Sequence, residues 1–226
     1  MLEYLAATGN TKQETDMTFD SKIWRLCLVT DRGLSRGRAI TDVVAAAVKG
    51  GATMVQLREK EAGTREFLEI ARAVKAILQP HGIPLLINDR VDIAIAVDAE
   101  GVHVGQTDMP VAIVRQMIGP GKIIGLSAGR EEYILAADAA AADYLGIGPL
   151  YAQTTKKNTG REPLGPQGFA EMRKLTRKPV MAIGGLKPDN AASVVAAGAD
   201  GLAVVSAIVG ADDVEAAARK FAALYR

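Results

Sequence analysis

The chain has 226 residues, a length that allows either one large α/β domain or two small ones. Hydrophobic residues make up 49% of the chain and charged residues 23%, a globular composition that excludes a disordered or collagen-like protein. The formal net charge of +1 provides no overall field to attract a polyanion, so nucleic acid is not an expected partner.

The N-terminal region and the cysteine content predict a cytoplasmic protein. Residues 1–21 contain neither the basic region nor the apolar segment of a secretory signal, and we predict a flexible leader there. No run approaches the roughly 18 apolar residues of a membrane span, so we expect no membrane association. The single cysteine, Cys27, excludes an intrachain disulfide and fits a reducing compartment. The sequence leaves open whether the chain forms a homo-oligomer.

Short apolar or β-branched runs alternate with longer helical patterns along the rest of the chain. The predicted strands are residues 26–30, 54–57, 84–87, 101–104, 123–126, 144–147, 180–183 and 201–205. The predicted helices are residues 41–49, 64–78, 91–97, 111–117, 131–140, 166–175, 190–197 and 214–224. We predict Thr41, Thr64 and Asp189 as helix N-caps, because their side chains can accept hydrogen bonds from free N–H groups.

Eight strand and helix units without a linker favour a single (β/α)₈ TIM barrel over residues 22–226. The alternative is an open, doubly wound sheet. It is weakened because the segment after the first strand, residues 30–35, lacks the G-x-G-x-x-G pattern of a dinucleotide-binding turn.

In such a barrel, function resides in the loops at the carboxyl ends of the strands. Arg58 and Lys60 follow the second strand and lie two residues apart, so they point the same way in an extended segment. They form a cationic pair that suits an anionic substrate. The alternative is a solvated loop in which Glu59 and Glu61 neutralise both charges.

Asp89 and Asp108 follow the third and fourth strands, which are neighbours in a barrel. Two converging carboxylates repel each other unless a divalent cation lies between them, and Mg²⁺ is often held by few protein ligands plus substrate phosphates. A magnesium site is therefore one interpretation of this pair. The alternative is that each aspartate caps the helix that follows it.

The segments after the last two strands predict a phosphate site. Gly184 and Gly185 follow the seventh strand, and residues 201–206 form the eighth strand and its end. Glycine N–H groups allow an anion to approach closely, and barrels often bind phosphate at this position. The alternative is that these glycines serve tight turns only. The segment 153–165 is rich in Thr, Lys, Gly and Pro, and we predict a mobile lid.

Two further residues are given structural rather than chemical roles. His103 lies within the fourth strand without a carboxylate or serine at triad spacing, so we predict a packed, hydrogen-bonded histidine rather than a catalytic base. Cys27 lies in an apolar strand and is predicted to be inert.

Seven motifs in order make the chain resemble the thiamine phosphate synthase family over about residues 26–221. They are Gln56-Leu57-Arg58-Glu59-Lys60, Leu86-Ile87-Asn88-Asp89, the segment 101–108, Gly125-Leu126-Ser127, Gly148-Pro149-Leu150-Tyr151 with Thr155-Lys156, Ile183-Gly184-Gly185, and the segment 198–206. The resemblance implies a Mg²⁺-dependent barrel enzyme. It would join 4-amino-2-methyl-5-hydroxymethylpyrimidine diphosphate to thiazole phosphate, giving thiamine phosphate and pyrophosphate.

The resemblance also implies a role for each matching residue. The pyrimidine diphosphate would be held by Gln56, Arg58, Lys60, Asn88, Ser127 and Lys156. The thiazole phosphate would be held by Thr155, Gly185, Val205 and Ser206, with Gln153 and Thr154 in the same lid, and Asp89 and Asp108 would bind Mg²⁺. Of these, Arg58, Lys60, Ser127 and Lys156 are assigned to catalysis.

The lid departs from the family pattern at one position, because Gln153 stands where the family usually has threonine. This leaves the exact thiazole substrate open. Three other functions remain as alternatives: a related thiazole tautomerase, a Schiff-base aldolase that uses Lys156, and a non-catalytic sensor of phosphorylated ligands. The complete set of diphosphate residues disfavours the tautomerase, and the exposed, glycine-flanked loop around Lys156 disfavours the aldolase. The pair Asp89 and Asp108 favours turnover over sensing.

Overall fold

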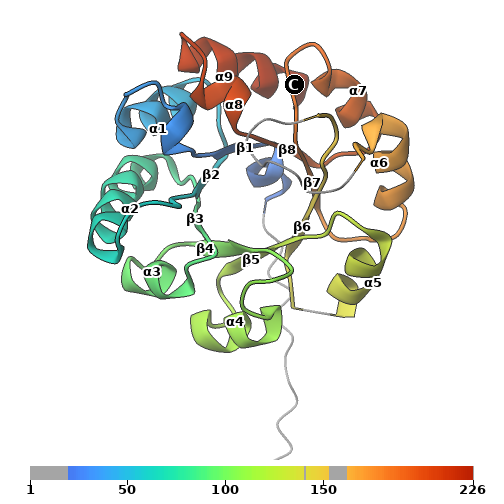
Figure 1. Ribbon diagram of the computed structural model, residues 1–226, viewed down its shortest axis with the longest axis horizontal. Coiled ribbons are helices and arrows are strands. Elements are labelled where there is room, and N and C mark those ends of the chain that lie inside the picture. The colour runs from blue at the N-terminus through green and yellow to red at the C-terminus, as the bar shows by residue number, and fades with distance from the viewer. Residues whose placement is uncertain (1–19, 140, 153–161, 226) are drawn as a thin grey trace, which may run out of the picture.

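The chain forms a closed barrel of eight parallel strands, each paired with its neighbours in chain order (Figure 1). The computed structural model describes residues 20–139, 141–152 and 162–225. The predicted (β/α)₈ barrel is confirmed, and the open sheet is excluded because the first and last strands pair through Leu26 and Leu202. Most of the predicted leader lies outside the described residues.

Strands and helices alternate along the chain as predicted. The strands are β1 (Leu26–Val29), β2 (Met54–Leu57), β3 (Leu85–Asn88), β4 (Gly101–Val104), β5 (Ile123–Ser127), β6 (Tyr144–Ile147), β7 (Val180–Ile183) and β8 (Gly201–Val204). The helices are α1 (Ile40–Lys49), α2 (Thr64–Leu78), α3 (Val91–Ala96), α4 (Val111–Ile118), α5 (Glu131–Ala139), α6 (Gly165–Arg173), α7 (Ala191–Ala196), α8 (Ser206–Val209) and α9 (Val214–Ala222). Short 3₁₀ helices are η1 (Ser21–Trp24), η2 (Arg32–Leu34), η3 (Gln79–His81) and η4 (Ala223–Tyr225).

The three predicted N-caps are wrong. α1 begins after Ala39, α2 after Gly63 and α7 after Asn190, and no side chain caps any of these three helices. Thr41 and Thr64 lie inside the first turn instead. The backbone can satisfy these helix starts without a side-chain acceptor because the first N–H groups can bond to water.

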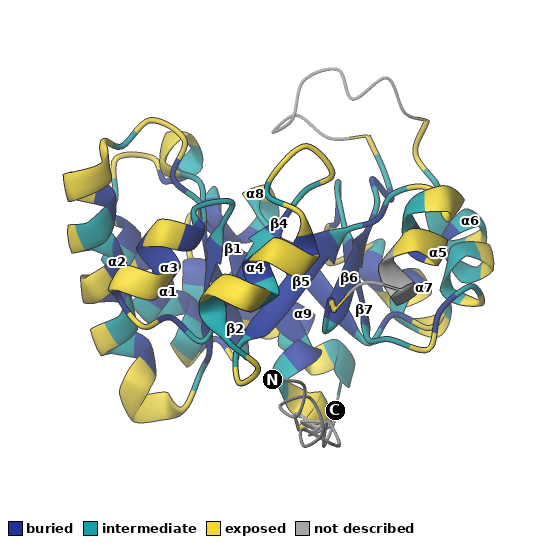
Figure 2. Cartoon of the chain, turned by 90° about the horizontal axis from the view of Figure 1, so that it is seen from below, coloured by how far each residue is buried: buried dark blue, intermediate teal, exposed yellow. Residues whose placement is uncertain are grey.

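Side chains alternate along each strand between the barrel interior and the helix layer, as period-two geometry requires. The outer set packs under the helices and includes Val55, Leu85 and Val102. The inner set forms a separate cluster of Trp24, Cys27, Val29, Met54, Leu86, Ile123, Tyr144, Met181 and Ala203. Figure 2 shows the resulting layers, with buried strands at the centre and exposed outer faces on the helices.

Two further expectations concern the environment of the chain. Among the described residues, no helix is long and apolar enough to cross a membrane. Cys27 is fully buried on β1, so its predicted place in the core is confirmed, and burial raises the pKa of its thiol to about 12.

Candidate active site

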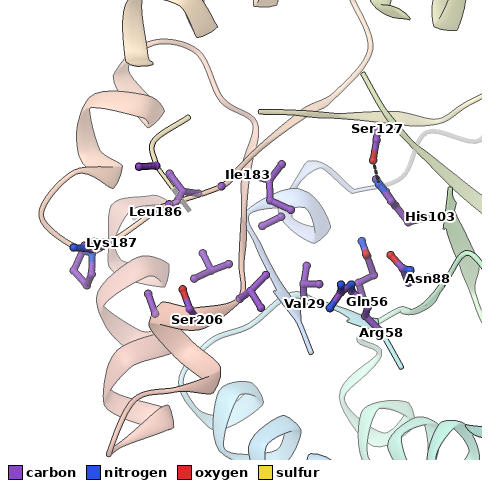
Figure 3. A pocket seen from close by; sticks show the side chains of 18 of the residues that line it. Val29, Gln56, Arg58, Asn88, His103, Ser127, Ile183, Leu186, Lys187 and Ser206 are labelled. Atoms are coloured by element: carbon purple, nitrogen blue, oxygen red, sulfur yellow. Dashed lines mark hydrogen bonds between the residues drawn. The ribbon is translucent and has the colours of Figure 1, made fainter. Parts of the chain in front are cut away.

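A cavity of about 740 Å³ opens at the carboxyl ends of the strands. Five of the residues that line it are polar side chains from β2 to β5: Gln56, Arg58, Asn88, His103 and Ser127. Others come from β7, β8 and the segments after them, including Ile183, Gly184, Gly185, Lys187, Val205 and Ser206. Figure 3 shows these two groups on opposite sides of the cavity.

The polar side follows from strand alternation. Gln56, Asn88, His103 and Ser127 occupy inward positions in the upper part of four consecutive strands, while their neighbours Leu57, Ile87, Val102 and Leu126 pack outward. β3 and β5 each end one residue later than the sequence predicted, at Asn88 and Ser127. Both residues are therefore fixed by strand pairing rather than carried on loops.

Arg58 is held from the side by the first loop of the barrel. Its guanidinium donates to the Asp31 carboxylate at 2.8 Å, and its backbone N–H donates to Thr30 Oγ1 at 2.9 Å. The neighbouring residues form a second bridge between the same two loops, because Arg32 Nε lies 3.1 Å from Glu59 Oε2. Arg58 is thus held in place before any substrate binds.

These contacts exclude Glu59 as a neutralising partner of the cationic pair. Glu59 does not neutralise Arg58 or Lys60, because it turns away to Arg32 with a side chain only 1% exposed. Its Oε1 atom is buried and has no hydrogen-bond partner among the residues that the structure describes. Burial therefore raises the pKa of the Glu59 carboxyl, although the Arg32 charge lowers it in part.

Lys60 donates to Asp89 Oδ2 at 2.5 Å, so the second cation of the pair bridges β2 and β3. Asp89 has a left-handed backbone, with φ of 62°. Its N–H donates to the carbonyl of His103 at 2.9 Å. Asp89 therefore lies against the end of β4.

Asp108 lies at the same strand end as Asp89. Its Oδ2 accepts from the Gly105 N–H at 2.7 Å, two residues after His103. The capping alternative is wrong for both aspartates, because α3 and α4 begin after Arg90 and Pro110 without a side-chain cap. Neither Lys60, Asp89 nor Asp108 is among the residues that line the cavity.

The side formed by β7 and β8 is shaped by the backbone. Gly184 and Gly185 both have left-handed backbones, with φ of 101° and 68°. A Cβ on Gly185 would lie 2.6 Å from the carbonyl oxygen of Ala152 and 2.7 Å from the Tyr151 Cβ. The missing side chain therefore makes room for the segment after β6, whereas the sequence argument attributed it to the approach of an anion.

A short helix missed by the sequence analysis starts at the end of β8. α8 spans only Ser206–Val209, follows Val205 directly and presents its first turn to the cavity, which Ser206 and Ala207 line. Its first N–H groups have no partner within the helix. Loops after strands seven and eight together with a short extra helix are a common phosphate site in barrels.

His103 and Lys187 are among the cavity residues that were not predicted as functional. His103 was expected to pack, and it is hydrogen-bonded and half-buried, but it also lines the cavity beside Ser127. Lys187 lines the opposite side, after Gly185 and Leu186. Period-two alternation on β4 could have found His103, while Lys187 carries no pattern in the sequence.

The predicted lid falls partly outside the described residues. This applies to four predicted site residues: Gln153, Thr154, Thr155 and Lys156. No group of three or more His, Cys, Asp or Glu side chains that could hold a metal ion occurs within 20–139, 141–152 and 162–225.

Comparison with known families decides where this chain belongs. Residues 26–208 match the family described as thiamine monophosphate synthase. The chain belongs to that family. The thiamine-phosphate synthase of Chloroflexus aurantiacus is 53% identical over 201 residues, which are 89% of this chain and 92% of that protein. The thiamine-phosphate synthase of Clostridium novyi is 45% identical over 199 residues, 88% and 97% of the two chains.

Solved structures agree with this assignment. The thiamine phosphate pyrophosphorylase of Pyrococcus furiosus matches with a TM-score of 0.82 and 37% identity, over 90% of this chain and 96% of that one. The 3-hexulose-6-phosphate synthase of Salmonella typhimurium covers 88% of this chain with a TM-score of 0.65. At 19% identity it shares the barrel fold alone.

Proposed function

We propose that this protein is a thiamine-phosphate synthase that acts in thiamine biosynthesis. It would transfer the pyrimidine methylene group of 4-amino-2-methyl-5-hydroxymethylpyrimidine diphosphate to thiazole phosphate. The products are thiamine phosphate and pyrophosphate. Membership of the family supports this function, and so does the run of polar inward side chains on four consecutive strands beside Arg58.

The polar side of the cavity suits the pyrimidine diphosphate. Gln56, Asn88 and Ser127 offer hydrogen-bonding groups to the pyrimidine, and Arg58 offers charged donors to the phosphates. Arg58 approaches the diphosphate already oriented by Asp31 at 2.8 Å. Lys60 would add a second positive charge next to it.

The reaction needs charge stabilisation rather than a protein nucleophile. The C–O bond between the methylene carbon and the diphosphate breaks, and both bonding electrons leave with pyrophosphate. The aminopyrimidine delocalises the positive charge left on carbon, and the thiazole nitrogen then donates its lone pair to form the new C–N bond. Fixed positive groups such as Arg58 and Lys60 stabilise the negative charge that develops on the leaving group.

Asp89 and Asp108 fit a Mg²⁺ ion whose remaining ligands come from the diphosphate and water. Both residues bond to the segment 103–105 at the end of β4, Asp89 through its backbone N–H to the His103 carbonyl and Asp108 through its carboxylate to the Gly105 N–H. Each engages a hydrogen bond through Oδ2, and Oδ1 of each accepts none within the described part of the chain. When bound, Mg²⁺ would neutralise part of the charge on the leaving diphosphate.

The opposite side of the cavity suits the thiazole phosphate. The N–H groups at the start of α8 and the backbone of Gly184 and Gly185 can bind a phosphate, while Val205 and Ile183 give the adjoining surface an apolar character. Lys187 supplies a positive charge nearby. The cytoplasm is the compartment in which we expect this chemistry.

The decisive experiment is to incubate the purified protein with both substrates and Mg²⁺, and to measure thiamine phosphate by mass and pyrophosphate by a coupled assay. We expect both products in equal amounts. A protein that binds both ligands without turnover would instead be the sensor. A borohydride-stable adduct with a sugar phosphate would indicate the Schiff-base aldolase.

A further inference from the structure

A chain of hydrogen bonds runs behind the polar side of the cavity, through two residues that have no assigned role. His103 Nε2 lies 2.9 Å from Ser127 Oγ, as the dashed line in Figure 3 shows, and His103 Nδ1 lies 2.8 Å from the Tyr144 hydroxyl. The imidazole therefore contacts a substrate-binding serine through one nitrogen and a fully buried phenol through the other.

The surrounding strands leave space for both rings. A Cβ on Gly125 of β5 would lie 2.4 Å from the Tyr144 hydroxyl oxygen, and a Cβ on Gly146 of β6 would lie 3.2 Å from His103 Cε1. The two rings pack with their centroids 5.5 Å apart. Any larger residue at Gly125 would displace the phenol, so the arrangement is fixed by the strands themselves.

The buried phenol of Tyr144 keeps its proton. Burial raises the pKa of its phenol well above the ordinary value, and a side-chain hydrogen bond with Gln56 lowers it in part. The phenol therefore stays protonated and keeps its O–H as a donor.

The direction of each hydrogen bond in the series Tyr144, His103 and Ser127 then follows from the one before it. A phenol is a more acidic donor than a serine hydroxyl, so Tyr144 donates to Nδ1 of the neutral imidazole. The imidazole proton must then reside on Nε2, where it donates to Ser127 Oγ. Because this bond occupies a lone pair of the serine oxygen, the Ser127 O–H is free to donate into the cavity.

We propose that His103, held in one tautomer by Tyr144, is a positioning residue that makes Ser127 a hydrogen-bond donor to the pyrimidine diphosphate. The acceptor is either a pyrimidine ring nitrogen or a diphosphate oxygen. This inference rests on the proposed function for the identity of the ligand. It assigns His103 a specificity role in place of the purely structural one that the sequence predicted.

The test is a double-mutant cycle on binding of the pyrimidine diphosphate, measured by calorimetry on the intact protein. His103→Leu removes the donor to Ser127 and should weaken binding on the order of 10-fold, the effect of losing one oriented hydrogen bond. In a Ser127→Ala background the same change should cost less than about 2-fold, because no hydroxyl remains to be oriented. Equal losses in both backgrounds would overturn the proposal.

Further variants separate positioning from folding. His103→Gln keeps a side-chain N–H donor and should restore most of the affinity lost in His103→Leu. Tyr144→Phe keeps the ring, removes the hydroxyl and should weaken binding by several-fold. Binding of the thiazole phosphate should change in none of them, and a parallel loss there would show a general structural defect and contradict the proposal.

Two probes identify the acceptor. If the Ser127 O–H donates to the ring, the loss in His103→Leu should appear with the unphosphorylated hydroxymethylpyrimidine. If it donates to phosphate, the loss should appear with inorganic pyrophosphate, and a loss with neither probe would count against the proposal. If the cycle shows the coupling but the wild-type protein forms no thiamine phosphate, the proposed function alone would be overturned.

Discussion

The two sides of the cavity are built by different means. On β2 to β5, the upper inward positions carry Gln56, Asn88, His103 and Ser127, so the groups that we propose for recognition there are side chains. On β7 and β1 and just after β8, the corresponding positions are the apolar Ile183, Val29 and Val205, and the groups that we propose for recognition are backbone N–H groups.

The two sides are therefore sensitive to different kinds of mutation. A side-chain site depends on residue type, so a single truncation removes a contact and leaves the backbone in place. A backbone site depends on conformation, so changing Ser206 or Val205 leaves every N–H present. It is sensitive instead to residues that set the backbone path, such as Gly185 with its φ of 68°.

The largest expected effect is the loss of the metal. We expect EDTA to abolish turnover and excess Mg²⁺ to restore it, because the leaving diphosphate would lose its main counter-charge. Asp89→Ala and Asp108→Ala should each lower kcat/KM on the order of 10²-fold or more. Full activity in EDTA would show that the reaction does not require Mg²⁺.

Arg58→Ala should lower kcat/KM roughly 10²-fold, the scale of losing one charged stabiliser of the leaving group. The KM for thiazole phosphate should remain nearly unchanged. Arg219→Ala is a matched control, because Arg219 forms an exposed ion pair with Glu215 on α9, away from the cavity. If the two variants gave equal activity, Arg58 would not contact the diphosphate.

The backbone side is tested by Gly185→Val. Its side chain would meet the backbone of Tyr151 and Ala152, so we expect the KM for thiazole phosphate to rise on the order of 10-fold together with a lower Tm. Gly121→Val is the control, because a Cβ there meets nothing within 4 Å. If calorimetry showed that the affinities for both substrates fall equally, the two sides would not be separate binding sites.

The smallest effect concerns the buried carboxyl beside Arg58. Burial raises the pKa of Glu59 on folding. As pH rises from the unfolded pKa near 4.5 through the folded pKa, the ionisation of Glu59 therefore lowers the free energy of unfolding. Glu59→Gln removes this ionisation. The Tm of the variant relative to wild type should therefore rise between pH 4 and pH 7, and a difference independent of pH would show that Glu59 does not titrate in that window.

The sequence predicted the strands better than the helix ends. Parallel strands buried on both faces give short apolar runs such as residues 54–57 and 144–147, which leave little freedom for another structure. Helix starts carry weaker information: Thr41 and Thr64 have the side chains of N-caps, yet the N-cap positions of α1 and α2 lie two residues and one residue earlier, at Ala39 and Gly63. The four-residue α8 was missed because it is too short to show periodicity.

The candidate site divides in the same way. The charged pairs Arg58 with Lys60 and Asp89 with Asp108 could be predicted from residue type and spacing. The roles of Gln56, Asn88 and Ser127 came from the family resemblance. The partners of Arg58 and Glu59 could not be predicted, because Asp31 and Arg32 lie 27 residues earlier and meet them only when β1 pairs with β2. The packing of Gly185 against Tyr151 and Ala152 could not be predicted either, because those residues follow a different strand.

The central claim is that the cavity places the two phosphorylated groups on opposite sides. The most direct measurement is a crystal structure of the protein with Mg²⁺, thiamine phosphate and pyrophosphate bound. We predict pyrophosphate against Arg58 and Lys60, and the thiamine phosphate ester against the backbone of Gly185 and the start of α8. Both phosphate groups on one side, or the reverse arrangement, would contradict the account.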